Sequence, residues 1–344
     1  MTKTTDLETA LGSDLGFGPA GPVYAQIICG HLLRVALELG LPDAIGDEEV
    51  PIDRLAAKVG AQPGPLHQVL RALTSVDYFR AVGDDRYANN EVSSALRSTV
   101  DGAPSLSGFA NAEWMWRLWD GLAEGVRTGV SPFQAQHGKN FFDYISQDAP
   151  QVAESFNFAM THGLGSTNAG VVSALDLAAT GKLVDVGGGQ GSLLRDLLRH
   201  NPALRGVLFD IESALDDVDP ELRSGTLAER CEIVAGDARR SVPGADAYVF
   251  RTVLHNWDDE SCVRMLSSCA RAGTPGARIF VVELDIDSGA PVAGFMDLQM
   301  FVLFGSRERS SAELADLFER AGIGYVGMST TSTLFSVFEG RLPG

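Results

Sequence analysis

The carboxyl-terminal half of the chain alternates between short apolar runs and longer segments with helical spacing. The apolar runs predict strands, and the segments between them predict helices. This alternation predicts a largely parallel, doubly wound sheet. The predicted strands cover residues 182–186, 205–209, 231–235, 246–251 and 277–283. Two later strands, at 322–327 and 333–338, are close enough to form a hairpin, which would make one edge of the sheet mixed.

The amino-terminal half is helical and contains the pattern of a winged helix. From Pro22, apolar residues recur on a broad helical stripe, typical of a helix buried on more than one side, and Pro42 fits its end. Residues 51–60 and 65–73 predict two short helices, and the alternating segment 78–87 predicts a hairpin. We therefore expect a helical winged-helix domain at 1–104, an aromatic-rich helical connector that contributes to a substrate pocket at 105–175, and an α/β domain with a Rossmann-like sheet at 176–344.

Charge argues against one common use of a winged helix. The chain has 27 Lys and Arg against 45 Asp and Glu, a formal net charge of −18. A surface of this sign repels phosphate backbones, so nucleic acid is not an expected partner. The second predicted helix offers only His67, Gln68 and Arg71 for base contacts. A structural or dimerising use of the motif fits better.

The four cysteines are scattered without a CxxC pair, which argues against a zinc site and a disulfide framework. No metal is expected. The segment Met1–Asp6 lacks the pattern of a signal peptide. No apolar run approaches the ~20 residues needed to cross a bilayer. We therefore expect a soluble, cytoplasmic protein without a membrane partner.

A glycine-rich turn carries the most specific chemical information. The strand Leu183–Val186 runs into Gly-Gly-Gly-Gln-Gly, and a helix follows. Without a Cβ the backbone of such a turn can come close to a ligand, and strand, turn and helix form the nucleotide-binding corner of a doubly wound fold. Gly187, Gly189 and Ser192 nearly match the dinucleotide fingerprint, and Asp210 can accept both ribose hydroxyls. These residues alone leave an NAD-dependent oxidoreductase open.

Two details favour S-adenosyl-L-methionine (SAM) instead. Asp185 precedes the bunched glycines, and a second acid follows the third strand in Gly236-Asp237-Ala238. One acid for the ribose and another near an adenine amino group suits SAM, which lacks a pyrophosphate and carries an ammonium, a carboxylate and a sulfonium. Asp210 and Asp237 each also have an ordinary explanation, because Asp is common in turns after strands.

The fourth strand ends in a dense polar run, Arg251–Glu260, at the edge where ligands bind in open α/β sheets. His255 lies just past that strand, and an imidazole with a pKa of about 6.5 is largely a free base at neutral pH. The ordinary alternative is that His255 packs beside Trp257. Asp258 and Asp259 precede a predicted helix and are expected to cap it.

Together these residues resemble the SAM-dependent small-molecule O-methyltransferases, which include plant caffeic acid type enzymes and bacterial relatives in antibiotic biosynthesis. The resemblance rests on Leu183–Gly191, Asp210, Gly236-Asp237, Val253–Asp259 and Arg307–Ser310, and it covers nearly the whole chain. It implies a Rossmann-like SAM methyltransferase domain, an amino-terminal dimerisation domain and a homodimer. It also implies methyl transfer to a hydroxyl of an aromatic or polyketide-like small molecule, with S-adenosyl-L-homocysteine as product. We expect this hydroxyl to be phenolic. The alternatives are a SAM-binding homologue with non-methylating chemistry and the oxidoreductase.

The resemblance implies roles for individual residues. His255 would deprotonate the acceptor hydroxyl, and Glu283 and Glu308 would hold its imidazole in place. Gly187 and its neighbours would hold the methionine part of SAM, and Asp210 the ribose. The expected cofactor-binding residues are Asp185, Gly187, Gly189, Gly191, Asp210, Gly236, Asp237, Ala238 and Arg251. The candidates for the acceptor pocket are Phe141, Met160, Asn256, Met296, Met300 and Phe304.

Two departures from the family pattern stand near the cofactor residues. Ala238-Arg239-Arg240 follows Gly236-Asp237, where family members commonly have an aromatic residue or Met. This departure changes the expected wall beside adenine and brings two cations to it. Arg251 stands where the plant enzymes usually have a lysine that contacts the cofactor.

Overall fold

The computed structural model describes residues 18–100, 103–104 and 112–344. They belong to two compact units, Met1–Arg117 and Leu118–Gly344, each described here by itself. The expectations for Met1–Asp6 and for residues 105–111 at the start of the connector fall outside the described residues.

The first unit is helical with a small antiparallel sheet of order β1-β3-β2. The predicted helices and hairpin at 51–90 are present as α4, α5 and the β2–β3 pair, in which Gly83 turns the chain with φ +65°. Its core includes Leu55, Leu66, Leu70 and Tyr87. The helices are η1 (Gly18–Ala20), α2 (Gly21–Glu38), α3 (Leu41–Ile45), α4 (Ile52–Val59), α5 (Pro63–Ser75), α6 (Glu91–Ala95) and α8 (Glu113–Asp120), which continues into the second unit. The strands are β1 (Val50–Pro51), β2 (Arg80–Val82), β3 (Arg86–Ala88), β4 (Thr99–Val100) and β5 (Ala103–Pro104).

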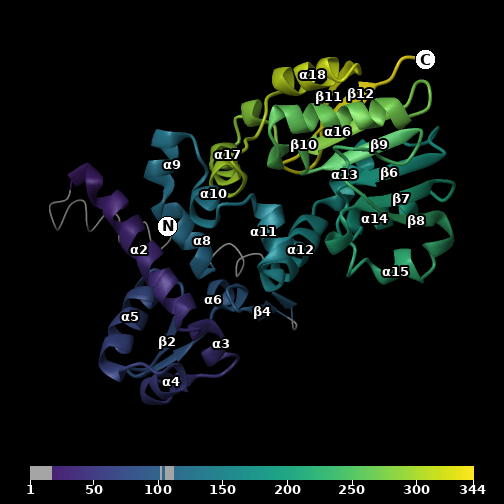
Figure 1. Cartoon of the computed structure of the whole chain (residues 1–344). Coiled ribbons are helices and arrows are strands. Elements are labelled where there is room, and N and C mark those ends of the chain that lie inside the picture. Colours follow the sequence, from purple (N-terminus) through teal and green to yellow (C-terminus); the bar gives the residue numbers. More distant parts are fainter. Residues whose placement is uncertain (1–17, 101–102, 105–111) are drawn as a thin grey trace. The chain divides into compact units, whose positions relative to one another are not determined.

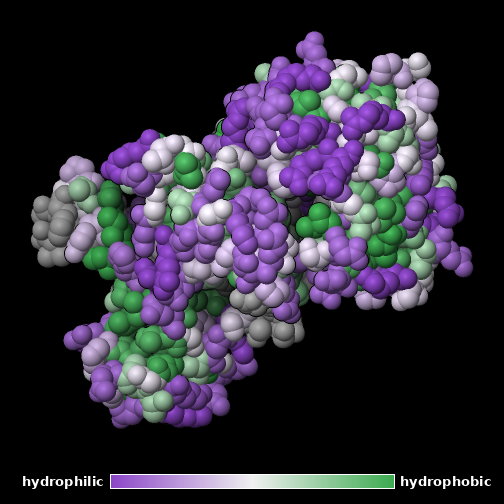
Figure 2. Space-filling view, in the orientation of Figure 1, coloured by the Kyte–Doolittle hydropathy of each residue, from purple (hydrophilic) through white to green (hydrophobic). Residues whose placement is uncertain are grey.

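The segment Gly18–Glu38, which includes α2, corrects one expectation. By length and composition alone it is long and apolar enough to cross a membrane, with a mean hydropathy of 1.2. The prediction that no apolar run approaches this length is wrong here. A single helix of this kind does not separate a membrane span from a core helix, which passes the same test. Ala25 and Cys29 are buried, whereas Val23, Tyr24 and Ile27 are exposed, and apolar surface lies along α2 in Figure 2.

The second unit contains a seven-stranded sheet of order β11-β12-β10-β9-β6-β7-β8 (Figure 1). The strands β6 to β10 of this sheet are parallel, and β12 pairs antiparallel with both of its neighbours. The strands are β6 (Lys182–Val186), β7 (Arg205–Asp210), β8 (Cys231–Ala235), β9 (Ala247–Arg251), β10 (Arg278–Glu283), β11 (Gly324–Thr330) and β12 (Ser336–Arg341). The five parallel strands lie within one residue of their predicted bounds. The predicted edge hairpin is confirmed, with both strands displaced towards the carboxyl terminus.

Helices cover both faces of this sheet, which is why its central strands are apolar on both sides. On one face α16 and α18 bury Tyr248 and Phe250, and on the other α13 and α14 bury Leu183 and Val249. The helices are α9 (Leu122–Thr128), α10 (Pro132–His137), α11 (Phe141–Gln147), α12 (Pro150–Gly165), α13 (Asn168–Ala174), α14 (Ser192–His200), α15 (Pro220–Arg223), α16 (Asp259–Ala272), α17 (Pro291–Phe304) and α18 (Ser311–Arg320). Short 3-10 turns are η2 (Glu212–Ala214), η3 (Ala228–Arg230), η4 (Leu254–Asn256) and η5 (Ile286–Ser288).

The strand order reverses between β6 and β9. From β6 the chain moves outward through β7 to β8, and it then returns to the opposite side of β6 as β9. The loops after β6 and β9 therefore diverge at the carboxyl edge and leave the crevice where open α/β folds bind ligands. The predicted cofactor residues and His255 lie at the carboxyl ends of β6, β7, β8 and β9 or in the loops that follow them.

Candidate active site

The glycine turn after β6 is open on one side only. A Cβ on Gly187 would lie 2.7 Å from the Val253 side chain, and one on Gly191 would lie 2.5 Å from Leu222. The fold itself therefore requires glycine at both positions. Gly189 has φ +56°, and a Cβ there would meet nothing within 4 Å. The turn thus offers its free space at Gly189, where a ligand can approach the backbone.

Backbone hydrogen bonds join this turn to the ends of β7 and β8. The N–H of Gly187 donates to the Phe209 carbonyl at 2.8 Å, and the N–H of Gly189 donates to Oδ2 of Asp210 at 2.8 Å. The N–H of Gly236 donates to the Asp210 carbonyl at 2.9 Å. Asp210 is therefore fixed between two glycine-containing loops. A carboxylate held by two backbone N–H groups keeps lone pairs that can accept the hydroxyls of a ribose.

Asp185 is a buried acid beneath the turn, with 1% of its surface exposed. Burial raises its pKa to about 7, although the charge of Arg251 lowers it. Its Oδ2 atom is buried and accepts no hydrogen bond within the described structure. A buried carboxylate in this state is poorly compensated, and a cationic ligand in the crevice would complement it.

Arg251, at the end of β9, has two of its nitrogens directed towards α13. Nη1 donates to Oδ1 of Asn168 and Nη2 donates to Oγ1 of Thr167. Burial lowers the pKa of Arg251, and the charge of Asp185 opposes that shift. The guanidinium expected to contact the cofactor therefore also fastens the start of α13 to the sheet.

The departure after β8 has a defined structure. Arg239 donates from Nε to Oδ1 of Asp237 at 2.9 Å and from Nη2 to Oδ2 at 3.0 Å. This pairing lowers the pKa of Asp237. The Arg239 guanidinium also lies 4.5 Å from the centre of the Trp257 ring. A carboxylate has about four lone-pair sites, so Asp237 retains capacity for an adenine amino group.

His255 sits in η4, just after a backbone residue of unusual conformation. Thr252 has φ +52°, which is costly for a β-branched residue, and such strain collects at functional sites. The side chain of Asn256 donates to the Thr252 carbonyl at 3.0 Å and holds this bend. Asn256, predicted to line the acceptor pocket, thus also shapes the loop that presents His255.

Two carboxylates hold His255 at different atoms. Its Nδ1 lies 2.9 Å from Oε1 of Glu308, and its backbone N–H donates to Oε1 of Glu283 at 3.0 Å. The hydroxyl of Ser306 donates to the His255 carbonyl. Glu308 therefore orients the ring, whereas Glu283 positions the backbone, so the two acids differ from the expectation that both hold the imidazole. With Nδ1 engaged, Nε2 is the nitrogen that can accept a proton from a substrate.

The electrostatics of this cluster favour a charged imidazole. Burial by itself lowers the pKa of His255, but the charge of Glu308 and its hydrogen bond outweigh burial, so the net direction is upward. Burial raises the pKa of Glu283, and the nearby Glu308 charge adds to that rise. Oε2 of each glutamate is buried without a hydrogen bond in the described structure.

Arg309 is a site residue to which sequence reasoning gave no role. Its side chain is 1% exposed, and it donates to the carbonyls of Leu254 and Trp257 and to Asp259. It therefore clamps both ends of the His255 loop. Its signal was present in the motif Arg307–Ser310. Asp258 caps α16 as predicted, with its carboxylate accepting the Ser261 N–H at 2.6 Å.

The structure brings part of the predicted acceptor pocket together. The rings of Phe141 and Phe304 meet edge to face, 5.2 Å apart. Phe141 is buried and Met300 is 4% exposed, whereas Met160 on α12 and Met296 on α17 are half-buried. Phe141 and Met300 are therefore part of the hydrophobic core, whether or not they also line a pocket.

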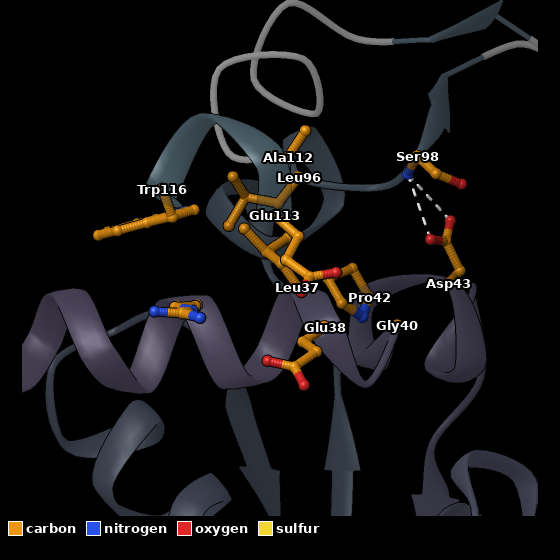
Figure 3. A pocket seen from close by; sticks show the side chains of 11 residues that line it. Leu37, Glu38, Gly40, Pro42, Asp43, Leu96, Ser98, Ala112, Glu113 and Trp116 are labelled. Carbon is orange, nitrogen blue, oxygen red and sulfur yellow. Dashed lines mark hydrogen bonds between the residues drawn. The ribbon is translucent and has the colours of Figure 1, made fainter. Parts of the chain in front are cut away.

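A separate hollow of about 310 Å³ lies in the first unit (Figure 3). Trp116 and Glu113 of α8 and Leu37 and Glu38 of α2 are among the residues that line it, and the Asp43 carboxylate accepts the Ser98 N–H nearby. None of the predicted site residues lines it, so it is not the candidate active site.

Comparisons with known proteins identify the family to which the chain belongs. A family model described as an O-methyltransferase domain matches residues 119–324, and an O-methyltransferase dimerisation domain matches residues 25–99. The mitomycin biosynthesis 6-O-methyltransferase of Streptomyces lavendulae is 37% identical over 297 residues, which cover 85% of this chain and 84% of that protein.

Solved structures agree with the sequence matches. The mitomycin 7-O-methyltransferase MmcR superposes with a TM-score of 0.85 and 34% identity over 93% of this chain and 96% of that one. NcsB1 from neocarzinostatin biosynthesis, solved with S-adenosyl-L-homocysteine and 1,4-dihydroxy-2-naphthoic acid, superposes with a TM-score of 0.79 and 30% identity over 91% and 95% of the two chains. These matches do not favour the oxidoreductase or the non-methylating alternative. The chain belongs to the family of SAM-dependent O-methyltransferases, and its amino-terminal unit carries that family's dimerisation domain.

Proposed function

We propose that this enzyme methylates a phenolic hydroxyl of a flat aromatic small molecule, with His255 as the base. The pairing of His255 Nδ1 with Glu308 carries the proposal, because it fixes which nitrogen faces a substrate. A phenol with a pKa of about 10 is mostly protonated at neutral pH, and a positioned base typically adds about 10²–10⁴-fold to the rate. Bound SAM supplies the electrophilic methyl group.

The cofactor residues act as a cradle in this proposal. The open side of the turn at Gly189 receives the methionine part, Asp210 accepts the ribose hydroxyls, and Asp237 accepts the adenine amino group. The buried charge of Asp185 complements the positive charge of the cofactor. Support comes from the free space at Gly189, the fixed Asp210 carboxylate and the unpartnered oxygen of Asp185.

We further propose that the enzyme is a homodimer in the cytoplasm. The exposed apolar side chains of Val23, Tyr24 and Ile27 form a stripe on α2 that a second copy would cover. The family model for a dimerisation domain supports this assignment. The four cysteines, all in the described part of the chain, form no disulfide, which fits a reducing compartment.

The base is tested with 1,4-dihydroxy-2-naphthoic acid as acceptor and radiolabelled SAM as donor. We expect His255→Ala to lower kcat by roughly 10²-fold or more while the Kd for SAM changes little. His200→Ala, at the exposed end of α14, is the matched control and should retain wild-type turnover. Full turnover in the His255 variant would reject the base, and binding of NADH in preference to SAM would reject the cofactor assignment.

Glu308→Gln tests the orientation of the ring. A Gln amide can donate to Nδ1, which leaves the proton on Nε2 and blocks base catalysis. We expect kcat to fall by roughly 10–10²-fold, the scale of a buried charge-assisted hydrogen bond. Because Glu308 raises the pKa of His255, the low-pH limb of the remaining activity should also move to lower pH. An unchanged pH profile would contradict this role.

A further inference from the structure

Four flat groups form a continuous stack beside the His255 loop. The guanidinium of Arg239 covers Trp257, and the Trp257 ring stacks on Phe142 with centroids 5.7 Å apart and planes 17° apart. Phe142 stacks in turn on Phe304, at 5.4 Å and 11°. Trp257 and Phe304, both in the described part of the chain, make no ring contact with each other. Phe142 therefore bridges them.

The stack lies next to the proposed base. Trp257 is two residues after His255, and Phe304 is two residues before Ser306, whose hydroxyl donates to the His255 carbonyl. A planar molecule held between Trp257 and Phe304 would therefore lie in the region where an acceptor must meet the imidazole.

The outer members of the stack are firmly held. The Trp257 carbonyl accepts a hydrogen bond from Arg309 at 2.7 Å, and its indole is covered by Arg239, which is paired with Asp237. Phe304 ends the 14-residue helix α17 and meets the buried ring of Phe141 edge to face.

Phe142 is the least constrained member. It is half-buried and is the second residue of the seven-residue helix α11. Its other ring contacts, with Phe141 and Phe156, are edge to face at 5.5 and 6.0 Å. Because Trp257 is held by Arg309 and Arg239, and Phe304 by Phe141, a rotation of Phe142 about χ1 would take its ring out of the stack and leave these contacts in place.

We propose that Phe142 is a gate that occupies the place of the acceptor's aromatic ring in the ligand-free enzyme and turns out when a flat acceptor binds. The inference rests on the proposed aromatic acceptor. Both stacking distances fall within the roughly 4.5–7 Å at which aromatic rings attract. A planar acceptor that replaced Phe142 would regain both contacts, whereas a non-planar one would not. Phe142 thereby selects for flat acceptors.

The test measures affinity for 1,4-dihydroxy-2-naphthoic acid by calorimetry with S-adenosyl-L-homocysteine present, which prevents turnover. If Phe142 is a gate, Phe142→Ala removes the competing ring, and the Kd should fall by roughly tenfold, the scale of one to two ring contacts. Phe295→Ala removes a ring that is 76% exposed on α17, and it should leave the Kd within about twofold of wild type. Cyclohexanol, a non-planar probe, should gain no affinity from Phe142→Ala.

Weaker or unchanged binding of the naphthoic acid by Phe142→Ala would overturn the gate, since a fixed wall loses contacts when truncated. Binding by neither protein would overturn it as well. If Phe142→Ala fails to fold, Phe142→Leu is measured instead and should change the Kd in the same direction by a smaller factor. Methyl transfer by the wild type is scored separately. If the wild type methylates the naphthoic acid but Phe142→Ala leaves its Kd unchanged, only the gate is refuted. If the naphthoic acid binds tightly and is not methylated, only the proposed function is refuted.

Discussion

Asp185 gives the sharpest quantitative prediction, because the structure leaves its charge poorly compensated. The side chain is 1% exposed, and its Oδ2 accepts no hydrogen bond in the described structure. Burial raises its pKa to about 7 from the ordinary 3.8. Asp185→Asn keeps the shape of the side chain and removes its charge. The variant should therefore avoid the cost of burying a charged carboxylate at high pH, and it should bind SAM more weakly.

The sign follows from proton linkage. Between the unfolded pKa and the raised folded pKa the native state binds more protons than the unfolded state, so stability falls as pH rises through this window. A shift of about three pKa units corresponds to an upper limit of roughly 4 kcal/mol of destabilisation above the folded pKa. Of this, roughly 2–3 kcal/mol develops between pH 5 and pH 8. The Asn amide leaves its own unpaired donors, which costs about 1–3 kcal/mol at every pH.

The assay is urea unfolding of the ligand-free wild type and Asp185→Asn at pH 5 and pH 8. Every other titrating group is shared, so the difference between the two proteins isolates Asp185. We expect this difference to shift in favour of the variant by roughly 2–3 kcal/mol between the two pH values. Calorimetry should show weaker binding of SAM by the variant.

A stability difference that is the same at pH 5 and pH 8 would refute the reasoning, because it would mean that the folded pKa of Asp185 is not raised above its unfolded value. Asp196→Asn is a useful comparison, because Arg195 and Asn168 hydrogen-bond to that carboxylate and its pKa is lowered. Its stability difference should be nearly the same at pH 5 and pH 8, because a carboxylate with a lowered pKa is ionised in both the folded and the unfolded state across this range.

Three further predictions concern the turn, the loop clamp and the dimer. Gly187→Ala should weaken stability by roughly 1–3 kcal/mol, because its Cβ would overlap Val253 at a positive φ, which urea unfolding measures. Gly189→Ala has the positive φ without an overlap, so it should lower SAM affinity with a smaller stability loss. Arg309→Met should reduce stability by roughly 1–3 kcal/mol, the scale for leaving the buried carbonyls of Leu254 and Trp257 without their donor, and unchanged stability would contradict the clamp. Ile27→Asp on α2 should convert a dimer into monomers in analytical ultracentrifugation, and a variant that sediments as a dimer would exclude α2 from the interface.

The strands of the second unit were predictable because they are buried on both faces. Val184, Val249 and Val281 belong to apolar runs that could not lie at a surface, so local composition sufficed. The last hairpin was predicted two to three residues too early. Its bounds follow from the pairing of β12 with β10 and β11, a tertiary register that local sequence does not contain.

The site was only partly predictable for a similar reason. The glycine turn and the His255 run are local patterns, and a resemblance carried by short motifs can find them. Glu283 and Glu308 have different roles because they bind different nitrogens of His255. These contacts join residues that are 28 and 53 positions apart in the chain, so local sequence does not predict them. The bridge made by Phe142 joins a connector helix to the loop after β9 and to the last residue of α17, and its ring geometry has no signature in sequence.

The uncompensated acids suggest how such a site is matched to its reaction. Asp185, Glu283 and Glu308 each keep a buried oxygen without a hydrogen bond in the described structure. A buried carboxylate in this state destabilises the empty protein, and it attracts positive charge more strongly than a solvated one. In the proposed reaction the cofactor brings a positive charge near Asp185, and proton transfer creates another on His255 beside Glu308. The fold therefore tolerates instability in the empty enzyme at the places where positive charge arrives or forms, which is why stability and function are expected to oppose each other at Asp185.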